Sequence, residues 1–165
     1  MSVVCAKVYN DKIVMAADSI VVRYGSDKNP SGSFLKMKRI NDVVVGTSGS
    51  AEEASLMWHY MATHNPFGAT EKDVLEYMIE FSRWKKDLTG SSSVSNDYLI
   101  AFTGKLFRVN GIFVTEIREF ESIGHGMCYS NAALHLGHTP REAVKVACDL
   151  DCFVAEPVIE EVILK

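Results

Sequence analysis

Segments with the patterns of strands and of helices occupy separate blocks of this sequence. Runs typical of strands come first, two helical segments follow, strands return, and two more helices precede a final strand. Such blocks favour an α+β fold in which helices and sheets stack in layers, and they argue against the alternating β-α-β units of a Rossmann domain. The predicted strands span residues 3–8, 13–17, 20–24, 34–40, 43–47, 98–102, 106–109, 119–123 and 158–164.

Capping residues mark where the predicted helices begin. Ser50 and Glu53 form a capping box before an apolar stripe, and Thr70 opens the second helix in the same way, with an acid three residues later. The third helix covers about residues 127–136. Thr139 caps the fourth helix, which has a proline at its first position and a glutamate at its third.

Length and composition fit one globular domain and exclude several kinds of partner. Residues 1–165 suffice for one domain with a core and are too few for two; 47% of them are apolar and 23% are charged. The net charge of −4 comes without a basic stripe or a basic amphipathic helix, which argues against binding to nucleic acid or to a membrane. No secretory signal is visible, and no apolar run reaches the roughly 20 residues of a membrane span. We therefore expect a cytoplasmic protein with free cysteines.

No pattern in the sequence predicts a cofactor or a metal. The glycine-rich motifs that cradle dinucleotides or nucleoside triphosphates do not occur, so any dependence on ATP would belong to a partner. His135 and His138 have a spacing that metal ligands can show, but Gly137 and Pro140 end the helix there, and no cysteine or carboxylate completes the set. We expect no intrinsic cofactor and no metal site.

Ser2 follows a single methionine, which makes it a candidate nucleophile. Methionine is normally trimmed when a small residue comes next, and removal of Met1 would give Ser2 a free α-amino group. The pKa of such an amine is about 8, so the amine can act as general base for the hydroxyl of its own residue. Without supporting patterns elsewhere, Ser2 would be an ordinary frayed terminal residue.

Such supporting patterns occur in a fixed order along the chain. They are SVVCA at residues 2–6, IVMAADS at 13–19, KMKRI at 36–40, VVVGTSGSA at 43–51 and IGHG at 123–126. Together these segments resemble the proteasome β-type family, and especially its bacterial relative HslV. The spacing from Ser2 to Asp18 equals the spacing from nucleophile to aspartate in that family.

The resemblance implies a four-layer α-β-β-α sandwich of the N-terminal nucleophile hydrolase type, and a role for each matched residue. Ser2 would be the nucleophile, and Lys36 would be a cation beside its hydroxyl. Asp18 would orient Lys36 and balance its charge, and the Gly49 N–H would bind the oxyanion of the tetrahedral intermediate. The resemblance also implies a homo-oligomeric ring and an ATPase unfoldase as partner.

Several positions depart from the family pattern. The nucleophile is serine where most members have threonine, so it lacks the methyl group that restricts the rotamers of the hydroxyl. The serine of the family's I-G-S-G turn is His125 here, which either acts in the site as a substitute base or only supports the turn. Asp151 matches the aspartate that supports the amine, whereas the serine three positions further on is replaced by Val154.

These observations predict a threonine/serine-type peptidase that hydrolyses peptides or unfolded proteins inside an oligomeric ring, with Ser2 as nucleophile once Met1 is removed. Two other functions fit the same residues. A small-molecule amidase or acylase would use the same nucleophile. A catalytically inactive ring subunit would account for His125 and for the missing serine hydroxyl.

Overall fold

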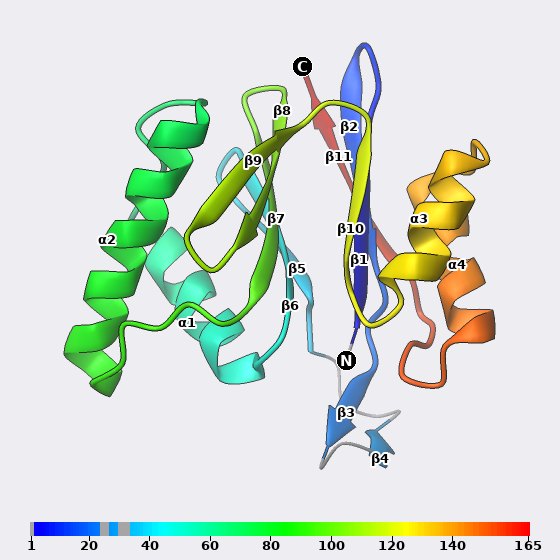
Figure 1. Ribbon diagram of the computed structural model, residues 1–165, viewed down its shortest axis with the longest axis horizontal. Helices are drawn as coiled ribbons and strands as arrows, with labels where there is room; N and C mark the ends of the chain where they lie inside the picture. The colour runs from blue at the N-terminus through cyan, green and yellow to red at the C-terminus, as the bar shows by residue number, and fades with distance from the viewer. Residues whose placement is uncertain (1, 24–26, 30–33) are drawn as a thin grey trace.

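Two β-sheets packed face to face, with a pair of helices on each outer side, make up the protein (Figure 1). The computed structural model describes residues 2–23, 27–29 and 34–165. Across these residues the layers follow the order helices, sheet, sheet, helices (Figure 1). This arrangement confirms the predicted α+β class and the four-layer α-β-β-α sandwich.

The first sheet holds the start of the chain in its middle. Its antiparallel strands are, in spatial order, β10 (Phe120–Gly124), β1 (Val3–Val8), β2 (Lys12–Ala17) and β11 (Ile159–Leu164). Both faces are covered, which is why β1 and β2 are almost continuously apolar. The register pairs Val3 with Gly124 on one side and Val4 with Ala17 on the other. The residues just after β2 and β10 therefore lie beside the first residues of β1.

The second sheet faces the first across the central core. Its antiparallel strands are, in spatial order, β5 (Met37–Ile40), β6 (Val43–Ser48), β7 (Asp97–Phe102), β8 (Lys105–Asn110) and β9 (Phe113–Ile117). Buried side chains from both sheets, among them Val4, Met15, Val44 and Leu99, form one cluster. Burial of each such side chain stabilises the fold by roughly 1.5–3 kcal/mol.

Two helices cover the outer face of each sheet (Figure 1). The pair α1 (Ala51–Met61) and α2 (Glu71–Thr89) lies on the second sheet, where an aromatic cluster fills the space between helices and strands. The pair α3 (Met127–His135) and α4 (Pro140–Leu150) lies on the first sheet. The predicted caps at Thr70 and Thr139 are both present as complete capping boxes.

The predicted capping box at α1 is only half formed. Ser50 accepts hydrogen bonds from the backbone N–H groups of Glu52 and Glu53. The Glu53 carboxylate does not return to Ser50; it turns inward to the Lys85 ammonium, and the Asn96 side chain accepts the Ser50 N–H instead. The prediction was wrong here because a buried ion pair gives the carboxylate a stronger partner than a solvated cap does.

Two strand predictions also differ from the structure, and two of the observed strands were not predicted. The segment 20–24 forms β3 (Val21–Arg23), which pairs with β4 (Asp27–Asn29) in a small separate sheet, and its last residue lies outside the described residues. The segment 34–40 becomes strand only from Met37. Strand β9 was not predicted, because none of its positions is fully buried and its sequence FVTEI lacks a clear alternation.

Two kinds of feature are absent from the described residues. None of their helices combines the length and the apolar character that crossing a bilayer requires. No three of their His, Cys, Asp and Glu side chains are grouped as the ligands of a metal ion would be.

Glu53 joins α1 to the second sheet through a buried network. Its carboxylate accepts hydrogen bonds from Lys85 Nζ (2.6 Å), Tyr98 Oη (2.9 Å), and the backbone N–H groups of Ser95 (3.1 Å) and Asn96 (2.9 Å). Burial by itself would raise the pKa of this carboxyl, but these hydrogen bonds to the charged form outweigh it and hold the pKa of Glu53 below its ordinary value of 4.5.

Acid should therefore weaken the fold through Glu53. The unfolded chain takes up a proton near pH 4.5, where the folded protein still resists it, so stability falls as the pH drops through the lower, folded pKa. Urea unfolding between pH 7 and pH 3 should show this decline, and Glu53→Gln should flatten it while lowering stability at pH 7. The matched variant Glu52→Gln alters an exposed neighbour on the same helix and should keep the decline. An equal decline in Glu53→Gln would rule this source out.

Candidate active site at the start of strand β1

Ser2 lies directly before β1, between the two sheets, with only 3% of its surface exposed. Its carbonyl oxygen accepts a hydrogen bond from the Gly126 N–H (3.3 Å), and the N–H of Val3 donates to Asp18 Oδ1 (2.8 Å). Gly124 has a φ of 95°, and a Cβ at this position would overlap the Ser2 carbonyl group. The backbone of Ser2 is therefore fixed from two sides. Met1 lies outside the described residues.

The hydroxyl of Ser2 donates a hydrogen bond to Oγ of Ser48 (2.8 Å), the last residue of β6. The sequence did not predict this partner, because the two serines are 46 positions apart and only the stacking of the two sheets brings them together. The one available signal was the place of Ser48 directly before Gly49. The hydrogen bond orients a side chain that has no γ-methyl group to restrict it.

Asp18 and Lys36 form a buried ion pair next to Ser2. Lys36 Nζ lies 2.6 Å from Asp18 Oδ2, and their side chains are 7% and 0% exposed. Lys36 precedes β5 and is tied to β6, because its carbonyl oxygen accepts a hydrogen bond from the Thr47 N–H (2.8 Å). Burial lowers the pKa of the Lys36 ammonium, and the Asp18 carboxylate opposes that shift.

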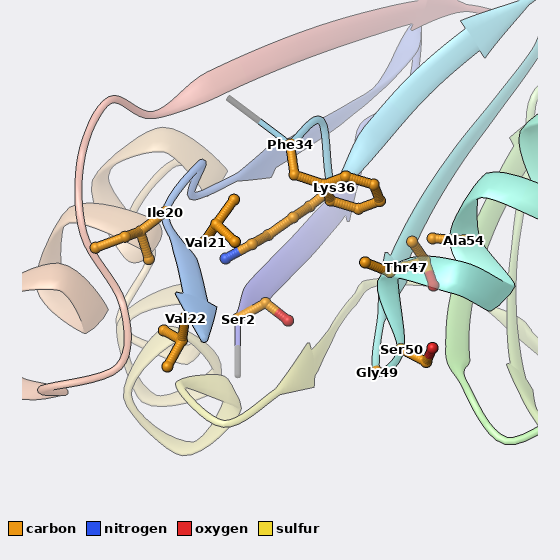
Figure 2. A pocket seen from close by; sticks show the side chains of 11 residues that line it. Ser2, Ile20, Val21, Val22, Phe34, Lys36, Thr47, Gly49, Ser50 and Ala54 are labelled. Carbon is orange, nitrogen blue, oxygen red and sulfur yellow. The ribbon is translucent and has the colours of Figure 1, made fainter. Parts of the chain in front are cut away.

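A pocket of about 110 Å³ opens in front of Ser2. Figure 2 shows the Lys36 side chain directed with its amine toward the side of the pocket where Ser2 lies, and Gly49 on the opposite wall. The rest of the lining is mostly apolar. It consists of Ile20, Val21, Val22, Phe34, Thr47, Ser50, Ala51 and Ala54. Of the predicted site residues, Ser2, Lys36 and Gly49 therefore meet at one pocket, and Asp18 holds Lys36.

Gly49 adopts a backbone conformation that few other residues could take. Its φ is 141°, and a Cβ at this position would overlap Asn96 Oδ1. The same Asn96 oxygen accepts a hydrogen bond from the Ser50 N–H (2.6 Å). Asn96 thus touches the pocket wall at the residue predicted to supply the oxyanion-binding N–H. The sequence did not single out Asn96, because it lies in a serine-rich segment whose pattern indicates only a loop.

His125 and Asp151 form a second group next to the first. His125 Nδ1 lies 2.6 Å from Asp151 Oδ2; the Asp151 side chain is 1% exposed and that of His125 is 52% exposed. The other Asp151 oxygen accepts the Phe153 N–H (2.8 Å). His125 lies between the two glycines that hold the Ser2 carbonyl, yet neither His125 nor Asp151 lines the pocket. The carboxylate accepts a hydrogen bond from Nδ1 and so fixes the orientation of the imidazole ring.

Comparisons with known proteins find structural similarity only. No family model matches the sequence, and no curated protein sequence matches it. Among solved structures, Thiobacillus denitrificans BPH in complex with epoxomicin is similar with a TM-score of 0.87 and 21% identity, over 98% of this chain and 98% of that one. Eukaryotic HslV from Trypanosoma brucei has a TM-score of 0.76 and 22% identity, over 99% of both chains.

A third similar structure shares this architecture at a still lower sequence identity. Anbu, the ancestral beta-subunit from Yersinia bercovieri, has a TM-score of 0.77 and 12% identity, over 98% of this chain and 81% of that one. Structural similarity at identities this low shows the architecture alone. The chain therefore has the fold of the HslV- and proteasome-type N-terminal nucleophile hydrolases.

Proposed function

We propose that the chain is an N-terminal nucleophile peptidase that cleaves peptide bonds with Ser2 after Met1 has been removed. The observation that carries this proposal is the pocket in front of Ser2, where a buried hydroxyl, a buried lysine and a glycine backbone converge. Hydroxyl, cation and N–H donor are the three groups that acyl transfer needs around one carbonyl carbon.

The free amine of Ser2 serves as general base in the proposed reaction. It takes the hydroxyl proton while Oγ forms a bond to the carbonyl carbon of the substrate. The Gly49 N–H stabilises the resulting oxyanion. As the intermediate collapses, the C–N bond breaks, the proton passes to the leaving nitrogen, and an ester on Ser2 is left. Water then hydrolyses this ester, which releases the acid and restores the hydroxyl.

Lys36 and Asp18 act on the charge of this reaction. The ammonium stabilises the negative charge that develops on Oγ. Asp18 fixes the lysine with one oxygen and the Val3 N–H with the other, so it holds both the cation and the backbone next to the nucleophile.

His125 and Asp151 support the amine in this scheme. His125 replaces the serine that the family resemblance places in its turn, and Asp151 keeps the imidazole oriented. With Nδ1 protonated, Nε2 can accept a hydrogen bond from an ammonium group. The pair therefore supplies an acceptor in place of the serine hydroxyl.

We infer the class of substrate from the lining of the pocket, and the assembly from the similarity in fold. The apolar side chains of Ile20, Val21, Phe34 and Ala54 favour a peptide or unfolded protein with an apolar residue next to the bond that is cut. We further infer a cytoplasmic homo-oligomeric ring that encloses the sites, with an ATPase unfoldase as partner. An enclosed chamber would keep this simple nucleophile away from folded proteins.

Intact mass of the native protein, before and after treatment with epoxomicin or a β-lactone, tests the proposal. Loss of Met1 together with a covalent adduct supports it. Retention of Met1 without an adduct would show a catalytically inactive subunit. A panel of fluorogenic peptides beside small acyl amides separates a peptidase from an amidase. Light scattering tests the ring, and a monomer or dimer would contradict it.

Replacing Ser48 with alanine should lower kcat about 2- to 10-fold, the effect of one net hydrogen bond of about 0.5–1.5 kcal/mol. The Ser2 hydroxyl would lose the partner that orients it. In a Ser2→Thr background the γ-methyl group restricts the rotamer instead, so the same replacement should cost less there. Steady-state kinetics on one peptide substrate, with all four combinations of the two sites, checks this. Equal losses in both backgrounds would argue against an orienting role.

A further inference from the structure

Asn96 makes three hydrogen bonds to the two residues that flank Ser48 and Gly49. Its Oδ1 accepts the Ser50 N–H (2.6 Å), and its Nδ2 donates to Thr47 Oγ1 (3.2 Å) and to the Ser50 carbonyl oxygen (2.9 Å). Asn96 is almost fully buried at the end of the loop that leads into β7. One side chain therefore bridges the segment from both of its ends.

Asn96 is itself anchored through its backbone. Its N–H donates to Glu53 Oε1 (2.9 Å), and the same carboxylate is paired with Lys85, whose Nζ lies 2.6 Å from Oε2. Lys85 also donates to the carbonyl oxygen of Ser93 in the serine-rich loop. The loop that carries Asn96 is thus tied to Glu53 on α1 and to Lys85 on α2.

Asn96 also contacts the backbone of Gly49, the residue proposed to bind the oxyanion. The absence of a Cβ at Gly49 lets Asn96 Oδ1 approach the backbone there, and the φ of 141° sets the plane of the peptide between Ser48 and Gly49. That peptide carries the Gly49 N–H. A donor to an oxyanion must be held in place before the charge appears, because reorientation during the reaction costs free energy.

We propose that Asn96 is a positioning residue for the oxyanion-binding N–H of Gly49, with Glu53 and Lys85 holding it in place; this inference rests on the proposed function. Among the described residues, the network reaches the pocket through residues 47–50, by the backbone at Gly49 and Ser50 and by the side chain of Thr47. It should therefore affect the tetrahedral species more than the ground-state complex.

Asn96→Ala should lower kcat about 10- to 100-fold, below the roughly 10²–10³-fold effect of deleting an oxyanion donor outright, and should change KM less than about threefold. A peptide boronic acid, which forms a tetrahedral adduct with a serine hydroxyl, should lose affinity by a factor similar to that for kcat. Asn96→Asp keeps the acceptor for the Ser50 N–H and loses the two donated hydrogen bonds, so it should fall between wild type and alanine.

A matched control separates positioning from stability. Val74 lies on α2, in the buried cluster between the helices α1 and α2 and the second sheet, and it does not line the pocket. Val74→Ala removes two buried methyl groups there, so it should lower Tm and leave kcat and boronate affinity unchanged. Wild-type kcat in Asn96→Ala, a loss confined to KM, or an equal kcat loss in Val74→Ala would overturn the inference. A wild-type protein that neither hydrolyses peptides nor binds the boronate would instead overturn the proposed function, and this inference with it.

Discussion

Ser2→Ala is expected to abolish peptide hydrolysis and covalent labelling by epoxomicin, with a loss on the order of 10⁴-fold or more in kcat. The variant keeps the amine, Lys36 and Gly49 and removes only the oxygen that we propose attacks the carbonyl carbon. No other described hydroxyl lines the pocket in an equivalent place, since Thr47 and Ser50 lie on its opposite wall (Figure 2). Fluorogenic peptides and intact mass measure the two effects.

Ser2→Thr is the matched control for this experiment. Threonine supplies the same oxygen, and its γ-methyl group restricts the rotamer, so hydrolysis and labelling should persist. The Tm of Ser2→Ala should change little, because the substitution removes one hydrogen bond worth about 0.5–1.5 kcal/mol. Hydrolysis or an adduct that survives in Ser2→Ala would place the nucleophile elsewhere in the chain.

Lys36→Ala should damage both activity and stability. The carboxylate of Asp18 would remain fully buried without the ammonium 2.6 Å away, and breaking a buried pair in this way costs about 3–5 kcal/mol of unfolding free energy. The developing charge on Ser2 would lose its nearby cation, so kcat should fall on the order of 10²-fold or more. Urea unfolding and peptide hydrolysis measure the two losses separately.

The double variant Lys36→Met with Asp18→Asn distinguishes these effects. It removes both charges and keeps an oxygen that can accept the Val3 N–H, so most of the lost stability should return. Activity should not return, because the cation is still absent. A double variant as active as wild type, or a Lys36→Ala protein whose rate stays within about threefold, would show that the ion pair serves the fold alone.

The layered architecture was accessible from the sequence because it depends on local signals. Strand and helix patterns in separate blocks predicted the α+β class, and the boxes at Thr70 and Thr139 placed the starts of α2 and α4. The box at Ser50 was mistaken because the partner of Glu53 lies on another helix, 32 positions away. A capping motif depends only on the residues of its own turn, so it does not indicate that a distant residue such as Lys85 binds the same carboxylate.

In the candidate site too, residues in recognisable local segments were predicted, and residues that depend on long-range contacts were not. The resemblance of short segments to the proteasome β-type family selected Ser2, Asp18, Lys36 and Gly49. Three of these residues line one pocket, and the fourth, Asp18, pairs with Lys36. Ser48 and Asn96 escaped notice because their contacts bridge 46 positions and depend on how two sheets and a loop stack. Nothing in the local sequence of a serine-rich loop indicates that one of its residues contacts the wall of the pocket.

The position of β1 between the strands β10 and β2 limits which mutations the start of the chain can tolerate. Pairing with β10 and β2 fixes the register of the residues of β1 from Val3 to Val8. Because Ser2 directly precedes Val3, this register also fixes the position of Ser2. Deleting one codon within β1 would turn each residue before the deletion to the opposite face. Substitutions that keep β1 apolar would be far easier to tolerate than a change in its length. The length of this short strand therefore determines where Ser2 lies relative to the pocket.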